Sequence, residues 1–465
     1  MSENTCPNVA LSRNQQMWVV KEDAGGRLAF PAATDIINVT VNVAANQEIP
    51  TSDSKEMANT LNKLNVFNNA ANPATAAFGM YLRPAALDAP MQGDALVEAL
   101  QGKMAVPFTG TLAANLTEGD AQIAVNVTAG HVPLRGVVEV AGDPSGKELI
   151  RYRKAVKDAS SPGKWTLCEL TRGYGGSTPV TGTSGGAVAL KSRVFVQALC
   201  RPNVSVWIAI DKTLQAVQGC HVTEAGIAVA NENAVELTGT FTGRRVFNAG
   251  PSAVEAEAQA GATSVAVEDA KVFFVGQRIQ NATKGDDNAG KCYAVTAVDE
   301  GTNTLTVAPG LSEAWAVDDV ATWWMPYGPA IGTELENTDS AIRINGVAGR
   351  MRSCTIKFST PTEFTSELGE RFPGQPIDSM RASGVDFEYY MRNDAARRLR
   401  EGGEGKEARL DVEFGSEEGR KVVVVCPRIK NKMPTINADS ATVTLSQSSD
   451  ILGIASEDAV EIVLE

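Results

Sequence analysis

The residue types that most often carry out acid–base and nucleophilic chemistry are scarce in this sequence. It has two histidines, His131 and His221, and neither lies near a plausible nucleophile in the sequence. A Ser-His-Asp or Cys-His site would therefore require contacts between distant segments. No pair of carboxylates has surroundings that would separate the two pKa values for acid and base roles. These observations predict no catalytic residue, with an enzyme such as a hydrolase on a β scaffold as an alternative.

Two segments share some features with ligand-binding loops. The run Arg172–Thr178 (RGYGGST) lacks the Gly-Lys-Ser/Thr ending of a phosphate loop and does not lie between a strand and a helix. The segment Lys284–Gly290 (KGDDNAG) offers carboxylates in a turn, but lacks the acidic residue that would complete an EF-hand shell. We predict plain turns at both places and no cofactor or metal site, with metal binding at the second segment as the alternative.

The bulk composition is that of a soluble globular protein, with 43% hydrophobic and 21% charged residues. The net charge of -13 argues against a sequence-specific duplex binder, because phosphate contacts need clustered lysine and arginine. Seven scattered cysteines without a Cys-x-x-Cys pair indicate reduced thiols in a protein made in a cytoplasm. We expect no membrane span, since no apolar run approaches ~18 residues. We expect no signal peptide, since the segment Met1–Pro7 (MSENTCP) lacks the basic and apolar regions of one.

Because the side-chain chemistry is sparse, the order of the elements carries the prediction. One strand-and-helix unit occurs twice, which indicates a duplicated domain. Phe78–Arg83 (FGMYLR) and Phe387–Arg392 (FEYYMR) share an aromatic residue, a tyrosine, an aliphatic residue and an arginine at matching places. A helix-sized segment follows each strand, at Asp94–Gly102 and Asn393–Gly402. Each segment begins with an Asx residue suited to N-capping and ends with glycine.

The elements around this unit are predicted in the same order in both halves of the chain. The first half is expected to contain strands at 15–20 and 36–43, an exposed loop at 45–57, a long hairpin at 64–83, the helix, a strand at 204–210 and a hairpin at 221–241. In the second half the strand at 204–210 has its expected counterpart at 422–426, and the last hairpin has its counterpart at 441–464.

Two further β segments interrupt these copies. Gly119–Val125 (GDAQIAV) in the first matches Gly261–Val267 (GATSVAV) in the second, so we predict two related small β-barrels. The predicted domains are copy 1 at 1–105 and 191–245, insert 1 at 106–190, insert 2 at 253–325, and copy 2 at 246–252 and 326–465.

The two copies resemble the tail tube proteins of long-tailed bacteriophages. The hairpin at Leu64–Arg83 and the proline-preceded helix at Ala89–Gly102 are similar to elements of that family. The closing strands at 221–241 and 434–464, and the Pro-Arg strand at Val423–Arg428, are similar as well. The resemblance covers both copies and excludes the inserts.

This resemblance implies a mainly β fold with two tandem tail-tube β-sandwich/barrel domains, each with a flanking helix, beside the two small inserted β-barrels. It implies a structural virion protein without catalysis or cofactor, a major tail protein of the duplicated subtype. Three chains would form a pseudo-hexameric ring, and stacked rings would form the tube through which genome DNA is ejected into the host. The implied partners are further copies of the chain and the tape measure, tail terminator and distal tail proteins.

Open strand edges support a ring, because soluble monomers must protect them and a closed ring pairs them. A barrel built from many strands would leave a channel. If acidic side chains face that channel, DNA passes without binding. The exposed loop is our candidate for the contact between stacked rings, with an ordinary loop as the alternative. It comprises Ile49, Pro50, Thr51, Ser52, Asp53, Ser54, Lys55, Glu56 and Met57.

A second function remains open. In it the chain is a β-rich virion binding, decoration or baseplate protein that recognises a cell-surface ligand through its small barrels.

Overall fold

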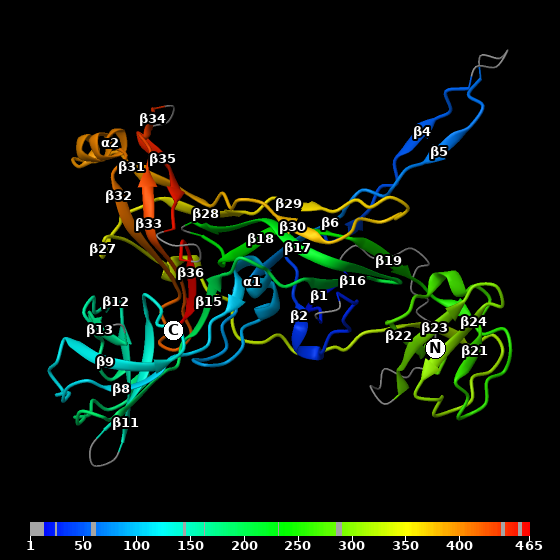
Figure 1. Cartoon of the computed structure of the whole chain (residues 1–465), viewed down its shortest axis with the longest axis horizontal. Helices are drawn as coiled ribbons and strands as arrows, with labels where there is room; N and C mark the ends of the chain where they lie inside the picture. The colour runs from blue at the N-terminus through cyan, green and yellow to red at the C-terminus, as the bar shows by residue number, and fades with distance from the viewer. Residues whose placement is uncertain are drawn as a thin grey trace, which may run out of the picture.

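The computed structural model describes residues 14–23, 26–56, 62–142, 146–161, 163–230, 232–284, 291–438, 442–453 and 458–465. The chain is mainly β, as its sequence predicts, with 48% of residues in strands and 7% helical. A long sheet crosses the middle of the molecule, and a compact β unit lies below each of its ends (Figure 1). We name these the first small unit (residues 109–190) and the second small unit (residues 252–324).

The long sheet contains two sets of strands that pair in the same order. In the first half this order is β1 (Gln15–Lys21), β16 (Val204–Ile210), β17 (Thr213–Val229), β18 (Glu236–Gly243) and β6 (Ala74–Tyr81). In the second half it is β26 (Ala341–Ile344), β32 (Glu407–Phe414), β33 (Val422–Asn431), β35 (Thr444–Ile451) and β31 (Gly384–Tyr390). The helix α1 (Asp94–Gln101) follows β6, and α2 (Ala395–Gly403) follows β31, so the order along the chain is also the same.

Nine further strands complete the long sheet. They are β2 (Ile36–Ile37), β3 (Ala45–Asn46), β7 (Gly102–Met104), β15 (Arg193–Gln197), β19 (Arg245–Ala249), β27 (Val347–Ala348), β28 (Ser353–Ser359), β34 (Thr435–Asn437) and β36 (Glu461–Leu464). Two hairpins extend from it, β4 (Thr51–Asp53) with β5 (Val66–Asn68) and β29 (Thr362–Phe364) with β30 (Pro376–Asp378). Short 3-10 turns lie at Ala33–Asp35, Tyr174–Gly176, Ala270–Val272 and Asn337–Asp339.

Each half has an outer and an inner layer of strands. In the first half, the long strand β17 takes part in both layers. Its first part pairs with β16 and β19 in the outer layer, and its second part pairs with β18 in the inner layer. Inward side chains of the two layers meet in one core, which contains Val206 of the outer strand β16 and Phe78 and Phe241 of the inner strands β6 and β18. The ring centroids of Phe78 and Phe241 lie 4.7 Å apart. The period of two along β6 places Phe78 and Met80 on this face.

The outer strands of the first half are apolar on both faces because the second small unit covers them. In β16, Val206 and Ile208 point into the main core. Trp207, between them, packs instead with Trp18 and Phe274 in an aromatic cluster against the second small unit. Burial of both faces explains why this strand reads VSVWIAI rather than alternating with polar residues.

The first small unit covers the second half in the same way. Val422 and Val424 of β33 belong to the main core, whereas Val423 and Val425 belong to the core of the first small unit. The first small unit therefore covers the half of the chain from which it does not start. The second small unit instead follows β19 of the first half and covers that same half.

The two small units share one strand order. The first contains β8 (Thr109–Leu112), β9 (Gln122–Ala129), β10 (Gly136–Ala141), β11 (Lys147–Tyr152), β12 (Lys154–Lys157), β13 (Lys164–Cys168) and β14 (Ala187–Leu190). The second contains β20 (Ser252–Ala253), β21 (Ser264–Ala266), β22 (Arg278–Asn281), β23 (Tyr293–Asp299), β24 (Thr304–Ala308) and β25 (Val320–Trp324). With β11 and β12 taken together as one strand, both follow the order first, sixth, third, fourth, fifth, second. Pairing of β8 with β9, and a bridge from Val254 to Val267, close the two circuits.

The predicted hairpin from Leu64 to Arg83 is wrong, and so is the predicted loop at 45–57. Strand β5 pairs with β4, and β6 pairs with β18 and β3. Residues 47–56 and 62–73 thus belong to one projecting arm instead of a loop followed by a hairpin. All residues of β4 and β5 are exposed, so neither strand carries the alternation by which a half-buried strand is found.

Three smaller expectations are corrected. The N-cap of α1 is Gly93 and that of α2 is Asp394, not Asp94 and Asn393. Gly402 lies inside α2, where a Cβ atom would approach the Lys432 carbonyl oxygen to 2.5 Å, so close packing explains this glycine. The strand expected at 36–43 ends at Ile37.

The expected counterpart of the strand at 204–210 is also wrong. Pairing assigns that place to β32, whereas 422–426 belongs to the counterpart of β17. Strand β32 (EARLDVEF) reads as a solvent-exposed strand, but its charged face is covered by the first small unit.

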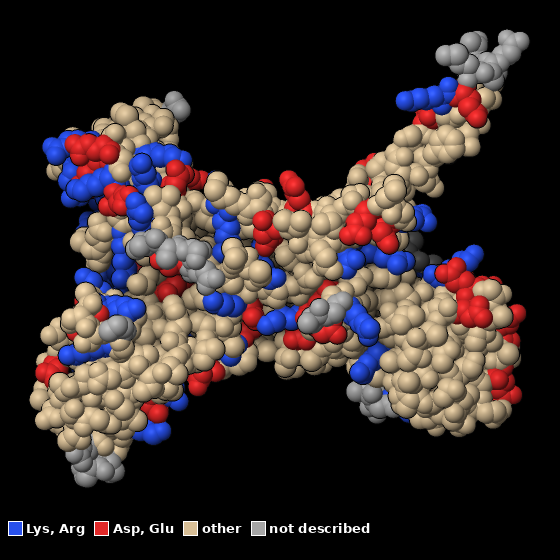
Figure 2. Space-filling model, viewed as in Figure 1, with Lys and Arg blue, Asp and Glu red and all other residues tan. Residues whose placement is uncertain are grey.

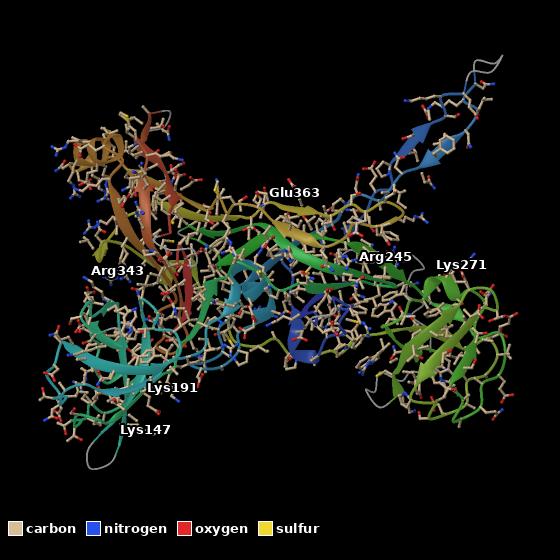
Figure 3. The ribbon with its side chains drawn as sticks, viewed as in Figure 1. Lys147, Lys191, Arg245, Lys271, Arg343 and Glu363 are labelled. Carbon is tan, nitrogen blue, oxygen red and sulfur yellow. The ribbon has the colours of Figure 1, made fainter. Side chains whose placement is uncertain are left out.

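A buried arginine attaches the first small unit to the second half. The side chain of Arg135 is fully buried, and its Nε lies 2.6 Å from Glu465 Oε1 and its Nη1 2.7 Å from Glu413 Oε1. Arg343 of β26 approaches the same Glu413 oxygen, at 3.1 Å (Figure 3). Burial alone would raise the pKa of Glu413, but hydrogen bonding and the charge of Arg135 lower it to about 2.

We predict that Arg135→Met destabilises the protein by about 3 kcal/mol or more, because two buried carboxylates lose their counter-charge. Urea unfolding followed by tryptophan fluorescence at pH 7 measures this loss. Arg343→Met is the matched control, since Arg343 is partly exposed and its loss should cost less than about 1 kcal/mol. Equal effects of the two variants would contradict the role given to Arg135.

The same ion pair predicts a pH dependence. The pKa of Glu413 is lowered from 4.5 to about 2, so its contribution to stability is complete above pH 4.5 and is lost between pH 4.5 and 2. The difference in unfolding midpoint between the parent and Arg135→Met should therefore narrow as the pH falls below 4.5. A difference that stays constant down to pH 2 would contradict this assignment.

Candidate subunit interface

The two histidines that the sequence singled out hold elements together. His131 Nε2 lies 3.0 Å from Glu461 Oε1, which joins the first small unit to β36. His221 contacts Asp378 Oδ1 through Nδ1 at 2.9 Å and Asn203 Oδ1 through Nε2 at 2.8 Å. Within the described residues, no group of three or more His, Cys, Asp and Glu side chains could hold a metal ion.

The glycine-rich run at Arg172 has a structural role. Arg172 donates from Nε and Nη2 to the two carboxylate oxygens of buried Glu148, at 2.8 and 2.7 Å, and the Gly173 amide donates to the same carboxylate. Gly173, Gly175 and Gly176 all have positive φ, which explains the glycines without a ligand. Residues 285–290 of the other candidate loop lie outside the described residues.

Eight strands form a continuous inner layer, which we name the inner sheet. Their order is β3-β6-β18-β17-β28-β31-β35-β34, and every pair is antiparallel. The first four strands come from the first half and the last four from the second. Strands β17 and β28 therefore form the junction between the halves.

The internal junction is a well-packed strand pair. Ile227 of β17 lies opposite Ile356 of β28, with Ala225 opposite Phe358 and Val229 opposite Cys354. Ile227 and Ile356 are buried in the main core. At this junction the second half covers the strand edge of the first half.

The corresponding position at the far end of the inner sheet is uncovered. Ile436 of β34 pairs with Leu445 as Ile227 pairs with Leu237, so the two isoleucines are equivalent. Ile227 is 1% exposed, whereas Ile436 is 49% exposed.

A second pair of equivalent residues differs in the same direction. Leu82 follows β6 and Met391 follows β31, directly after the equivalent residues Tyr81 and Tyr390. Leu82 is 2% exposed and Met391 is 45% exposed. The chain thus covers this apolar edge in its first half and leaves it open in its second.

The two projecting hairpins are also equivalent. The hairpin β29–β30 leaves β28 and returns to β31, as β4–β5 leaves β3 and returns to β6. In Figure 1, β29–β30 lies along the first half, whereas β4–β5 projects away from the molecule. Each carries an exposed apolar residue at the matching place, Phe67 and Ile377.

Polar contacts hold β29–β30 on the first half. Asp378 at the end of β30 accepts from Arg201 Nε at 2.7 Å, and His221 binds the same carboxylate. Burial raises the pKa of Asp378, but hydrogen bonds from Arg201 and His221 outweigh burial and hold it well below its usual value. Arg245 lies between the rings of Phe247 and Phe372, which adds a second contact (Figure 3).

The predicted contact residues Ile49–Glu56 lie on the projecting arm. Thr51, Ser52 and Asp53 form β4 and are exposed, and Asp53 forms an ion pair with Lys63 at 2.7 Å. Met57 lies outside the described residues. The exposed edge at Ile436 was not predicted from the sequence. The equivalence of Ile436 and Ile227 could have revealed this edge if the strand β32 had been predicted.

The open face of the inner sheet is polar. Hydroxyl side chains line β18 at Thr238, Thr240 and Thr242. Three cations on this face are paired with carboxylates: Lys357 with Asp386 at 2.6 Å, Lys432 with Asp450 at 2.6 Å and Arg352 with Glu388 at 2.9 Å. Around α2, charges of both signs are mixed in the same way (Figure 2).

No protein-family model matches the chain, and no curated protein matches it. In the described part of the chain, no helix is long and apolar enough to cross a membrane.

Replacing Asp378 tests the anchor of β29–β30. We predict that Asp378→Asn speeds amide hydrogen exchange in residues 362–378 about tenfold or more, because the buried Arg201 loses its counter-charge. Mass spectrometry of peptides from this hairpin measures the change. Glu363→Gln, an exposed neighbour on the same hairpin (Figure 3), is the control and should leave exchange unchanged.

Proposed function

We propose that this chain is a structural subunit of a bacteriophage tail tube, which assembles into rings that stack into a hollow conduit for DNA. The observation that carries the proposal is the difference in exposure between Ile227 and Ile436. Ile227 of the first half is covered by the second half. The equivalent Ile436 is left open at the far end of the inner sheet, where a further copy would cover it. A contact that repeats in one direction and closes gives a ring.

In this proposal the chain contains two tandem tube domains and two inserted β-barrels. The repeated strand order, the helix after β6 and β31, and the matching strand order of the small units support this division. Each chain then supplies two of six positions, so the ring is a trimer with pseudo-sixfold character.

The inner sheet gives the ring a lumen. Eight strands from each of three chains make a barrel of 24 strands (3 × 8), which is wide enough to leave an open channel. The polar open face, with three cations paired to carboxylates, suits DNA that slides past without binding. The chain has no catalytic role in this proposal.

The projecting arm provides the contact between stacked rings. Its exposed apolar residues Leu64, Val66 and Phe67 support this role, because monomers rarely extend such residues into solvent on a two-stranded hairpin. The tape measure, tail terminator and distal tail proteins are the further partners of such a tube, and the virion tail is its location.

A second candidate function is recognition of a cell-surface ligand. A groove of about 410 Å³ between the second small unit and the β16–β17 turn is lined by Trp323, Trp324 and Tyr327 beside polar Gln280 and Thr322. Aromatic faces next to a few hydrogen-bonding groups are typical of ligand sites. The second small unit also presents a broad area without charged side chains (Figure 2).

Assembly tests the first proposal. Concentrated protein should form hollow tubes of uniform width with threefold rings in negative-stain electron microscopy. Ile436→Asp should abolish rings while the far-ultraviolet circular dichroism spectrum stays unchanged, because a carboxylate would be buried without a partner.

Val275→Asp provides the control for this substitution, since Val275 is equally exposed but lies on the second small unit. This variant should form tubes like the parent. A parent chain that stays a monodisperse monomer and binds a glycan would contradict the tube and favour the second function.

A further inference from the structure

The two open edges of the inner sheet differ in how their main chain is satisfied. In the described residues, β34 pairs on one side only, with β35, and β3 pairs on one side only, with β6. On the outer side of β3, glutamine side chains take the place of a strand. Gln215 accepts from the Ala45 amide at 2.8 Å and donates to the Ala45 carbonyl at 3.2 Å. Gln15 accepts from the Val43 amide at 2.8 Å.

These main-chain groups are the counterparts of those that form the internal junction. Ala45 lies opposite Ala76 of β6, as Ile356 lies opposite the equivalent Val385 of β31. Ala45 is therefore equivalent to Ile356, whose partner across the junction is Ile227. The carboxamide of Gln215 donates and accepts at one residue, as a paired strand residue does.

We propose that β34 of one chain adds to the edge of β3 of a second copy, with Ile436 opposite Ala45, and displaces the Gln215 and Gln15 side chains from that edge. This inference rests on the proposed ring and identifies the strands that close it. The register follows from the internal junction: Thr435 lies opposite Asn46, and Asn437 opposite Ala44.

The glutamine contacts keep the edge satisfied before a partner arrives. An open edge is a template for uncontrolled pairing, and side-chain amides protect it. Strand exchange then replaces the side-chain hydrogen bonds at Ala45 with main-chain hydrogen bonds and covers Ile436. The exchange leaves few polar groups unpaired, so burial of the apolar edge can drive ring closure.

Disulfide trapping tests the register. Thr435→Cys combined with Asn46→Cys should give covalent trimers on a non-reducing gel after mild oxidation, because facing residues in a strand pair lie within disulfide range. These two residues are exposed and lie at opposite ends of the inner sheet of one chain. Thr435→Cys with Glu48→Cys is the matched control, since that pair is two residues out of register and about 7–8 Å apart. The parent chain sets the background from its own cysteines.

Each outcome decides a separate point. Trimers that form with Asn46→Cys and not with Glu48→Cys support the register. Tubes that form without this cross-link, or with equal cross-linking of both pairs, overturn the inference and leave the ring intact. A parent chain that forms no rings overturns the proposed function and this inference with it.

A second variant tests the glutamine contact itself. Gln215→Ala should shorten the lag before ring formation by about threefold or more, because two hydrogen bonds no longer compete with the arriving strand. Gln218→Ala is the control, since Gln218 lies on the same strand but donates to the Gly26 carbonyl at 2.7 Å. An unchanged lag for Gln215→Ala would show that the glutamine does not protect the edge.

Discussion

Hydrogen bonding along the strand edges is the constraint on which the rest of this structure depends. An eight-stranded antiparallel layer has two edges, and each edge leaves main-chain donors and acceptors that must find partners. Inside the chain, β17 of the first half pairs with β28 of the second half, so the donors and acceptors of these two edges bind each other. At the outer ends the solutions differ within the described residues: glutamine side chains bind the edge of β3, while β34 pairs only with β35 and its Ile436 is exposed. The asymmetry gives the molecule a direction, with one edge that is protected and one that is free.

The same constraint explains the arrangement of the outer layer. Strands β16 and β33 carry apolar residues on both faces, which a sandwich with one solvent face would not tolerate. The two small units cover these faces, one through an aromatic cluster around Trp207 and the other through Val423 and the buried Arg135. They are therefore part of the folding core of each half and not merely attached to it.

The sequence predicted the elements whose side chains follow a clear period and missed those whose environment hides it. Phe78 and Phe387 revealed the repeated strand because inward residues alternate along it. Strand β32 was missed because Arg409, Asp411 and Glu413 suggest a face in water, whereas ion pairs bury that face under the first small unit. The arm was misread because both faces of β4 and β5 are exposed. The open edge at Ile436 depends on which strands are neighbours, which no local pattern encodes.

The packing of the first small unit on the second half also affects the order in which the structure can form during synthesis. Arg135 and its partner Glu465 are 330 residues apart in the chain. At translation rates of about 5–20 residues per second, roughly tens of seconds separate the appearance of the two partners. During that interval the first small unit lacks the surface of β33 on which it packs, and β36 is absent from its place between β15 and β33. The strands that form the open edge near Ile436 are made in the same late period. In the proposed ring, the edge that would join a second copy is therefore made only late in translation.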